Sequence, residues 1–162
     1  MAQNAHPQET TTAASTGGPF AISLTLEGGK LEFKSGEPIP VSAKLINTSG
    51  FEIIYRDYFG DRLFYTIAVW VIDPAGLQRN RKVERTTEGI MAGRISSLFG
   101  KMAEVKIPPS GEHRPVSIDL ARHFFMSTKG RYRVVFSRMM PNPMNPATFV
   151  HVKSNEVVFT IE

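Results

Sequence analysis

The sequence contains no cysteine, and this absence excludes several kinds of site together. A chain without cysteine has no disulfide framework, no thiol nucleophile and no cysteine-based zinc site. It also has no apolar run near the roughly 18 residues that suggest a transmembrane segment, and no basic patch with an apolar stretch that would indicate a signal peptide. What remains is a chain of 162 residues, long enough to fold as one globular domain without a covalent or metal staple.

The short motifs that mark common active sites are also missing. The sequence has no G-x-S-x-G elbow, no H-E-x-x-H, no P-loop and no G-x-G-x-x-G. Its 4 histidines are scattered, without another histidine or a carboxylate at metal-ligand spacing; they are His6, His113, His123 and His151. We therefore predict a protein that is not an enzyme and needs no cofactor.

Residues 1–18 differ in composition from the rest of the chain. They are rich in Ala, Gln, Asn, Thr, Ser and Gly and hold no large apolar side chain after Met1. Such a segment cannot bury enough apolar surface to offset its ordering entropy, which predicts a disordered tail. The Ala2-Gln3 start is typical of a mature exported protein whose leader was replaced by methionine. We expect a periplasmic or secreted protein; the alternative is a cytoplasmic protein with an ordinary tail.

From Phe20 onward, apolar residues recur at every second position, the spacing of a half-buried strand. The clearest examples are Phe20 to Leu26, Val41 to Leu45, Val116 to Leu120 and Tyr132 to Phe136. Leu63 to Ile72 forms a longer apolar strand, whose Trp70 is expected in the core, while a loop is expected from Met139 to Pro146. Many short strands between Gly- and Pro-rich turns predict an all-β Greek-key β-sandwich over residues 19–162.

Two further segments interrupt the alternation. Between Thr87 and Met102 the apolar residues have helical spacing, but Gly89, Gly93 and Gly100 disfavour a regular helix, so a short helical or irregular excursion is predicted. A short turn of helix is also predicted near Ala121 to Met126. Asn47 to Ser49 matches a glycosylation sequon, but Asn47 also ends a strand, where asparagine is favoured as a turn residue.

The second half of the chain carries an ordered series of motifs. A Pro-Pro-Ser-Gly turn ends at Gly111, an Asp-Leu pair follows at Asp119, and Gly130 leads to Tyr132 and Val134 at alternate positions. Ser154 and Asn155 then open the last strand. This order resembles immunoglobulin-like domains of exported bacterial proteins, and is similar in pattern to the intracellular proteinase inhibitor family. The resemblance implies an immunoglobulin-like sandwich, with Tyr132 as a tyrosine corner.

The charge is unevenly distributed along the chain. Residues 77–101 hold 6 Lys or Arg against 2 acids, and residues 120–155 hold 6 basic residues and no acid, although the whole chain is only +4. If the two segments adjoin, they attract an anionic partner; otherwise they line solvated strands and protect edges. Nucleic acid is disfavoured, because no aromatic residues alternate with the basic ones.

These features lead to three hypotheses. The first is a non-catalytic module that binds a protein or an anionic polymer, with contacts at Arg79, Arg81, Lys82, Arg85, Leu98, Phe99, Arg131 and Arg133, and in the Pro-rich loop from Met139 to Met144. The second, from the resemblance, is a proteinase-inhibitor-like domain. The third is a periplasmic Cu(I)-binding sandwich, because thioethers and imidazoles suit Cu(I); its ligands would be Met139, Met140, Met144 and His151.

Overall fold

The computed structural model describes residues 18–57, 66–72, 78–86, 103–113, 116–124, 126–145 and 147–162. Most of them lie in strands: β1 (Phe20–Leu26), β2 (Glu32–Phe33), β3 (Pro40–Asn47), β4 (Ile53–Asp57), β5 (Thr66–Ile72), β6 (Gln78–Thr86), β7 (Ala103–Ile107), β8 (Val116–Asp119), β9 (Gly130–Pro141), β10 (Phe149–Lys153) and β11 (Val157–Ile161). A 3-10 turn, η1 (Glu27–Gly29), follows β1. In the described part of the chain, α2 (Leu120–His123) is the only α-helix. The all-β prediction is confirmed.

Two of the predictions concern residues outside the ranges that the structure describes. The predicted tail, apart from Gly18, lies outside the described residues. So does the predicted excursion between Thr87 and Met102, together with its candidate contact residues Leu98 and Phe99. The short helix predicted near Ala121 is present, one residue earlier than expected, and the Asp119 side chain caps it by accepting a hydrogen bond from the Ala121 N–H.

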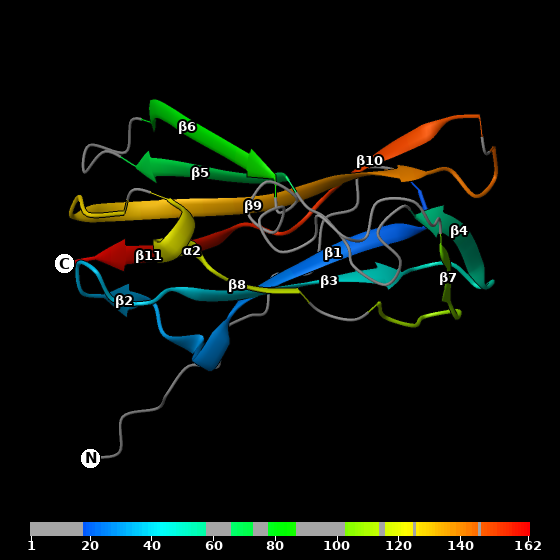
Figure 1. Ribbon diagram of the computed structural model, residues 1–162, viewed down its shortest axis with the longest axis horizontal. Helices are drawn as coiled ribbons and strands as arrows, with labels where there is room; N and C mark the ends of the chain where they lie inside the picture. Colours follow the sequence, from blue (N-terminus) through cyan, green and yellow to red (C-terminus); the bar gives the residue numbers. More distant parts are fainter. Residues whose placement is uncertain are drawn as a thin grey trace, which may run out of the picture.

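The strands form two layers that share one core. One sheet has the order β1-β3-β8, and a larger one has the order β2-β11-β9-β5-β6, with β10 also pairing with β9. Figure 1 shows β5, β6 and β9 above β1, β3 and β8, with the two-stranded ribbon of β4 and β7 at one end of the molecule. Buried side chains from all three sheets belong to a single hydrophobic cluster.

The core confirms the alternation predicted from the sequence. Ile22, Leu24, Leu45 and Val134 are buried, as is Tyr132, while the intervening side chains of these strands are more exposed. The Tyr132 ring stacks on Phe159 with 5.6 Å between ring centroids. Its hydroxyl donates a hydrogen bond to the Thr128 carbonyl oxygen at 2.6 Å, the contact predicted for a tyrosine corner.

Two details of the sequence prediction are wrong. Trp70 is only half-buried, because Ile67 and Val69 take the core-facing positions of β5 and leave Trp70 on the outer side. A continuously apolar strand lacks the alternation that would have indicated this. The predicted loop from Met139 instead begins after Pro141, since β9 continues through Pro141, which pairs with Phe149 at the end of the strand, a position where proline is tolerated.

Asn155 joins the two layers at the break between β10 and β11. Its side-chain oxygen accepts a hydrogen bond from the Leu24 N–H at 2.8 Å, and its amide nitrogen donates to the Leu24 carbonyl oxygen at 2.8 Å. A side chain therefore takes the place of a neighbouring strand for one residue of β1. Next to it, Ser154 forms a parallel bridge with Ile22.

We expect Asn155→Ala to lower the free energy of unfolding by about 1–2 kcal/mol, because two backbone groups of Leu24 lose their partners. Hydrogen exchange of the Leu24 amide should accelerate more than that of its neighbours in β1. The adjacent Glu156→Ala is the control, since it removes only an exposed ion pair with Arg133. Equal effects of the two variants would contradict this role for Asn155.

Candidate functional site

The hairpin formed by β9 and β10 presents an apolar outer face. In β9 and β10, Met139 pairs with His151 and Pro141 pairs with Phe149, so these four side chains share one face. Met139 is 56% exposed and Phe149 is 63% exposed. The opposite face of the same strands is buried, with Met140 and Val152 in the core. The outer apolar side chains are therefore available to a partner.

The turn between these strands is held by asparagine side chains. Asn142 Oδ1 accepts a hydrogen bond from the Met144 N–H at 3.0 Å, and Asn145 Oδ1 accepts one from the Ala147 N–H at 3.3 Å. The Asn142 N–H also donates to the Thr148 carbonyl oxygen at 3.0 Å, which closes the turn. Met144, which is 76% exposed, is thus presented on a fixed backbone. A preformed turn lowers the entropic cost of binding.

A pocket of about 310 Å³ continues this face onto the neighbouring ribbon. Its walls come from β4 and β7 on one side and from the start of the hairpin turn on the other; they are Ile53, Ile54, Tyr55, Glu104, Pro141, Asn142 and Pro143. Ile54 is 50% exposed. We define the hairpin surface as Ile54, Met139, Pro141, Met144 and Phe149. It combines exposed apolar side chains with a pocket that adjoins them at Ile54 and Pro141, and both features are common in protein-binding sites.

The charges around the hairpin surface are mostly positive. From Leu120 to Asn155 there is no acidic residue. The exposed Lys153 lies on the outer face of β10, while Arg138 of β9 lies on the opposite face with Met140. Arg138 donates from Nε to the Met140 sulfur at 3.1 Å. The one acidic wall of the pocket, Glu104, forms an ion pair with Lys106 at 3.3 Å.

The structure brings the two basic segments into one sheet. β6, which carries Arg79, Arg81, Lys82 and Arg85, pairs with β5, and β5 pairs with β9, which carries Arg131 and Arg133. In the pairing register, however, Arg79 lies opposite Val71, which lies opposite Tyr132 on its other side. Arg85 lies opposite Ile67, which lies opposite Phe136. Arg81 and Lys82 fall in the irregular stretch between Arg79 and Val83. Arg79 and Arg85 therefore lie at different register positions from Arg131 and Arg133.

The two outward arginines of β9 also differ from each other. Arg131 is exposed. The Arg133 guanidinium lies 4.8 Å from the centre of the Trp70 ring and forms an ion pair with Glu156 at 3.4 Å. Because an aromatic face and a carboxylate already engage it, Arg133 contributes less than Arg131 to the attraction of an anionic polymer.

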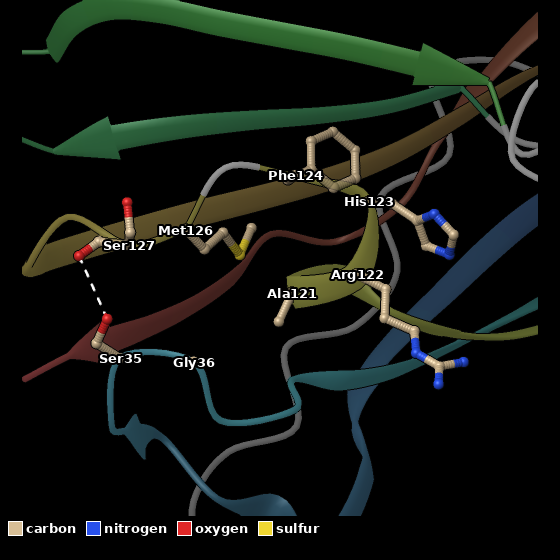
Figure 2. Close-up of a pocket in the computed structure, with 8 residues that line it drawn as sticks. All are labelled: Ser35, Gly36, Ala121, Arg122, His123, Phe124, Met126 and Ser127. Atoms are coloured by element: carbon tan, nitrogen blue, oxygen red, sulfur yellow. Dashed lines mark hydrogen bonds between the residues drawn. The ribbon is translucent and has the colours of Figure 1, made fainter.

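A second pocket, of about 380 Å³, lies beside α2. Figure 2 shows Ser35, which donates a hydrogen bond to the Ser127 carbonyl oxygen, on one side of this pocket, while the Arg122 and His123 side chains extend on the far side of α2. The basic groups thus point away from the two serines. In the neighbouring turn, the Lys30 ammonium and the Lys34 N–H lower the pKa of the Glu37 carboxyl by hydrogen bonding to it.

The predicted copper ligands fall into two groups. Met139 and His151 face each other on the outer side of the hairpin, and Met144 lies in its turn. Met140 is fully buried on the opposite side, so it cannot join the others at one surface ion. Among the described residues, no three His, Cys, Asp or Glu side chains are grouped as a metal site. The described residues also include no helix long and apolar enough to cross a membrane.

Comparison with known proteins identifies no family. No family model matches the chain, and no curated protein matches it. Among solved structures, the C-terminal domain of wzt is similar with a TM-score of 0.46 and 10% identity, over 94% of this chain and 79% of that one. The sporulation control protein Spo0M from Bacillus subtilis has a TM-score of 0.45 and 13% identity, over 90% and 50% of the two chains.

A β-glucosidase from Listeria innocua, in complex with isofagomine, has a TM-score of 0.42 and 12% identity over 88% of this chain. The chain spans only 16% of the length of that enzyme. Similarities at this level of identity and TM-score assign no activity, ligand or partner to this chain.

Sequence reasoning named Met139 and Met144 as contact residues but missed Ile54 and Phe149. Phe149 is missed because prolines precede the strand that holds it. They hide where the strand begins, and therefore which of its side chains face outward. Ile54 is missed because β4 is apolar on both faces, with Ile53 and Tyr55 buried on either side of it. Its exposure depends on which face of β4 meets the core, and that is decided by packing.

Proposed function

We propose that this protein is a non-catalytic interaction module that binds a protein partner through the hairpin surface. The observation that carries the proposal is the exposure of Met139, Met144 and Phe149 on one hairpin whose turn is held by its own hydrogen bonds. Large apolar side chains on an ordered element favour binding, because their burial is favourable and little order has to be imposed.

The partner we propose is a protein segment that combines apolar and acidic side chains. The hairpin surface supplies the apolar contact, and the exposed Lys153 lies on the same face of β10 as Phe149 and His151. A second copy of this chain would place like charges against each other, which disfavours self-association. A purely anionic polymer is the alternative at the outer face of β6, β5 and β9, where Arg131 is exposed but Arg133 is engaged by Trp70 and Glu156.

We also infer that the fold is an immunoglobulin-like Greek key and that the protein acts in the periplasm or outside the cell. The tyrosine-corner hydrogen bond of Tyr132 and the two-layer arrangement support the first inference. The second is supported by the resemblance and by the composition of residues 1–18. A genomic reading frame without a leader upstream of Ala2 would contradict export.

The proteinase-inhibitor alternative requires an extended loop that enters a protease cleft. The turn of the β9–β10 hairpin is instead folded back on itself, with the Asn145 N–H donating to the Asn142 carbonyl oxygen and the Thr148 N–H donating to the Asn145 carbonyl oxygen. This hairpin therefore does not supply such a loop. Inhibition assays against a panel of proteases test the alternative directly.

The proposal predicts the outcome of selecting a displayed random-peptide library on the immobilised protein. Enriched peptides should combine aromatic or aliphatic residues with Asp and Glu. Phe149→Ser should weaken their binding by about tenfold or more, as expected for losing one large apolar contact. Fluorescence anisotropy measures the affinities, and the melting temperature should stay unchanged because Phe149 is mostly exposed.

Leu31→Ser is the matched control, because Leu31 is also an exposed apolar residue but lies outside the hairpin surface. It should leave peptide binding within about twofold of the original. Enrichment of basic peptides, or equal losses in the two variants, would contradict the proposal. If heparin stabilises the protein and Arg131→Gln abolishes that stabilisation, the result would support the polyanion alternative instead.

A further inference from the structure

Met139 and His151 form a cross-strand pair of a thioether and an imidazole on the outer face of the hairpin. The register places them directly opposite each other in β9 and β10, and both side chains are exposed. Directly opposed residues in antiparallel strands have Cβ atoms roughly 4.5–5.5 Å apart. At that separation, a flexible thioether and an imidazole ring can both reach one ion placed above the sheet.

The same geometry separates these two residues from the other methionines of the hairpin. Met140 is 0% exposed, and its sulfur accepts a hydrogen bond from Arg138 Nε. Its neighbour in register is Val150, which also packs against the core. Met140 is therefore a core residue. Met144 lies in the turn beyond Pro141, where no register position sets it opposite His151.

We propose that Met139 and His151 bind Cu(I) as a two-ligand surface site. Thioether sulfur selects soft ions such as Cu(I), while imidazole suits several transition metals, so the combination favours Cu(I) over zinc, magnesium or calcium. Harder ions prefer oxygen ligands or a larger set of nitrogen ligands. Pro141 and Phe149 lie on the same face next to the pair, which gives the site an apolar side.

The site is independent of the proposed partner, because the pair needs no second protein. It nevertheless shares Met139 with the hairpin surface. Cu(I) bound at Met139 would place a charged ion in the apolar contact, so metal binding and partner binding should compete there.

The test is an anaerobic titration of the full chain with Cu(I) alone, in competition with a chromogenic Cu(I) chelator. Met139→Leu keeps the size of the side chain but removes the sulfur, and His151→Gln removes the imidazole. Each should weaken the affinity by at least about tenfold. In spectra of the methionine methyl groups, the Met139 signal should shift with Cu(I) and the Met140 signal should not.

Met144→Leu is the matched control, since it removes an even more exposed thioether from the same hairpin. Its affinity should stay within about twofold of the original. A shift confined to the Met144 methyl group, or an affinity that Met139→Leu leaves unchanged, would overturn the proposal. So would an equal Met139 shift with Zn²⁺, because the site would then not select a soft ion.

Discussion

Asn47→Ala should lower the free energy of unfolding by about 3 kcal/mol. The Asn47 side chain is 0% exposed. Its amide nitrogen donates to the carbonyl oxygens of Phe51 at 2.8 Å, Ile107 at 3.0 Å and Pro108 at 3.0 Å. Its oxygen accepts hydrogen bonds from the N–H and the hydroxyl of Ser49. Alanine removes all of these buried or partly buried hydrogen bonds, at about 0.5–1 kcal/mol each.

Thermal unfolding should show this loss as a fall in melting temperature of about 6–12 °C. Asn145→Ala is the matched control, because Asn145 also bonds a backbone N–H but lies in an exposed turn. Its effect should stay below about 1 kcal/mol. Asn47→Asp should be nearly as damaging as alanine, since a carboxylate keeps the acceptor but cannot donate to three carbonyl oxygens. Equal melting temperatures for Asn47→Ala and Asn145→Ala would refute this role.

The second prediction concerns Tyr132 and uses two variants to separate its ring from its hydroxyl. Tyr132→Ala should lower the free energy of unfolding by about 3–5 kcal/mol. The buried ring stacks on Phe159, and its removal leaves a cavity. Tyr132→Phe keeps the ring and removes only the hydrogen bond to Thr128, so it should cost about 1 kcal/mol. Denaturant unfolding measures both. A loss with Phe as large as with Ala would show that the ring contributes little.

The Tyr132 hydroxyl also predicts a pH dependence. Burial raises the pKa of Tyr132 above its ordinary value. A raised pKa in the folded state means that the unfolded chain loses the phenolic proton first. The stabilising contribution is therefore complete below the ordinary pKa of about 10 and is lost as the pH rises through the folded value. Tyr132→Phe should flatten this alkaline loss.

The alternation of apolar residues was sufficient to predict most of the core. Ile22, Leu24, Leu45 and Val134 are buried as expected, because successive side chains of any strand point to opposite faces. Prediction failed where both faces are apolar, as at Trp70 and Ile54. In these strands the pattern does not say which face meets the other sheet.

The candidate site was predictable only in part. The methionines of the hairpin were predicted as contact residues because they lie in a Pro-rich segment. Met139 and Met144 are exposed, as a contact surface requires. Their separation from Met140 depends on β9 continuing to Pro141, which the prolines of this segment conceal. The opposition of Met139 and His151 depends on a pairing register that is set by the length of the turn between them.

The amino-acid sequence by itself determined that this chain is all-β and which side chains turn inward in the strands with a clear alternation. These follow from the local geometry of a pleated backbone. Only the tertiary structure decided that Asn155 reaches Leu24, that Asn47 joins two distant turns, and that Ile54 meets the β9–β10 hairpin. Such contacts join residues far apart in the chain, so they are set by how the sheets pack together.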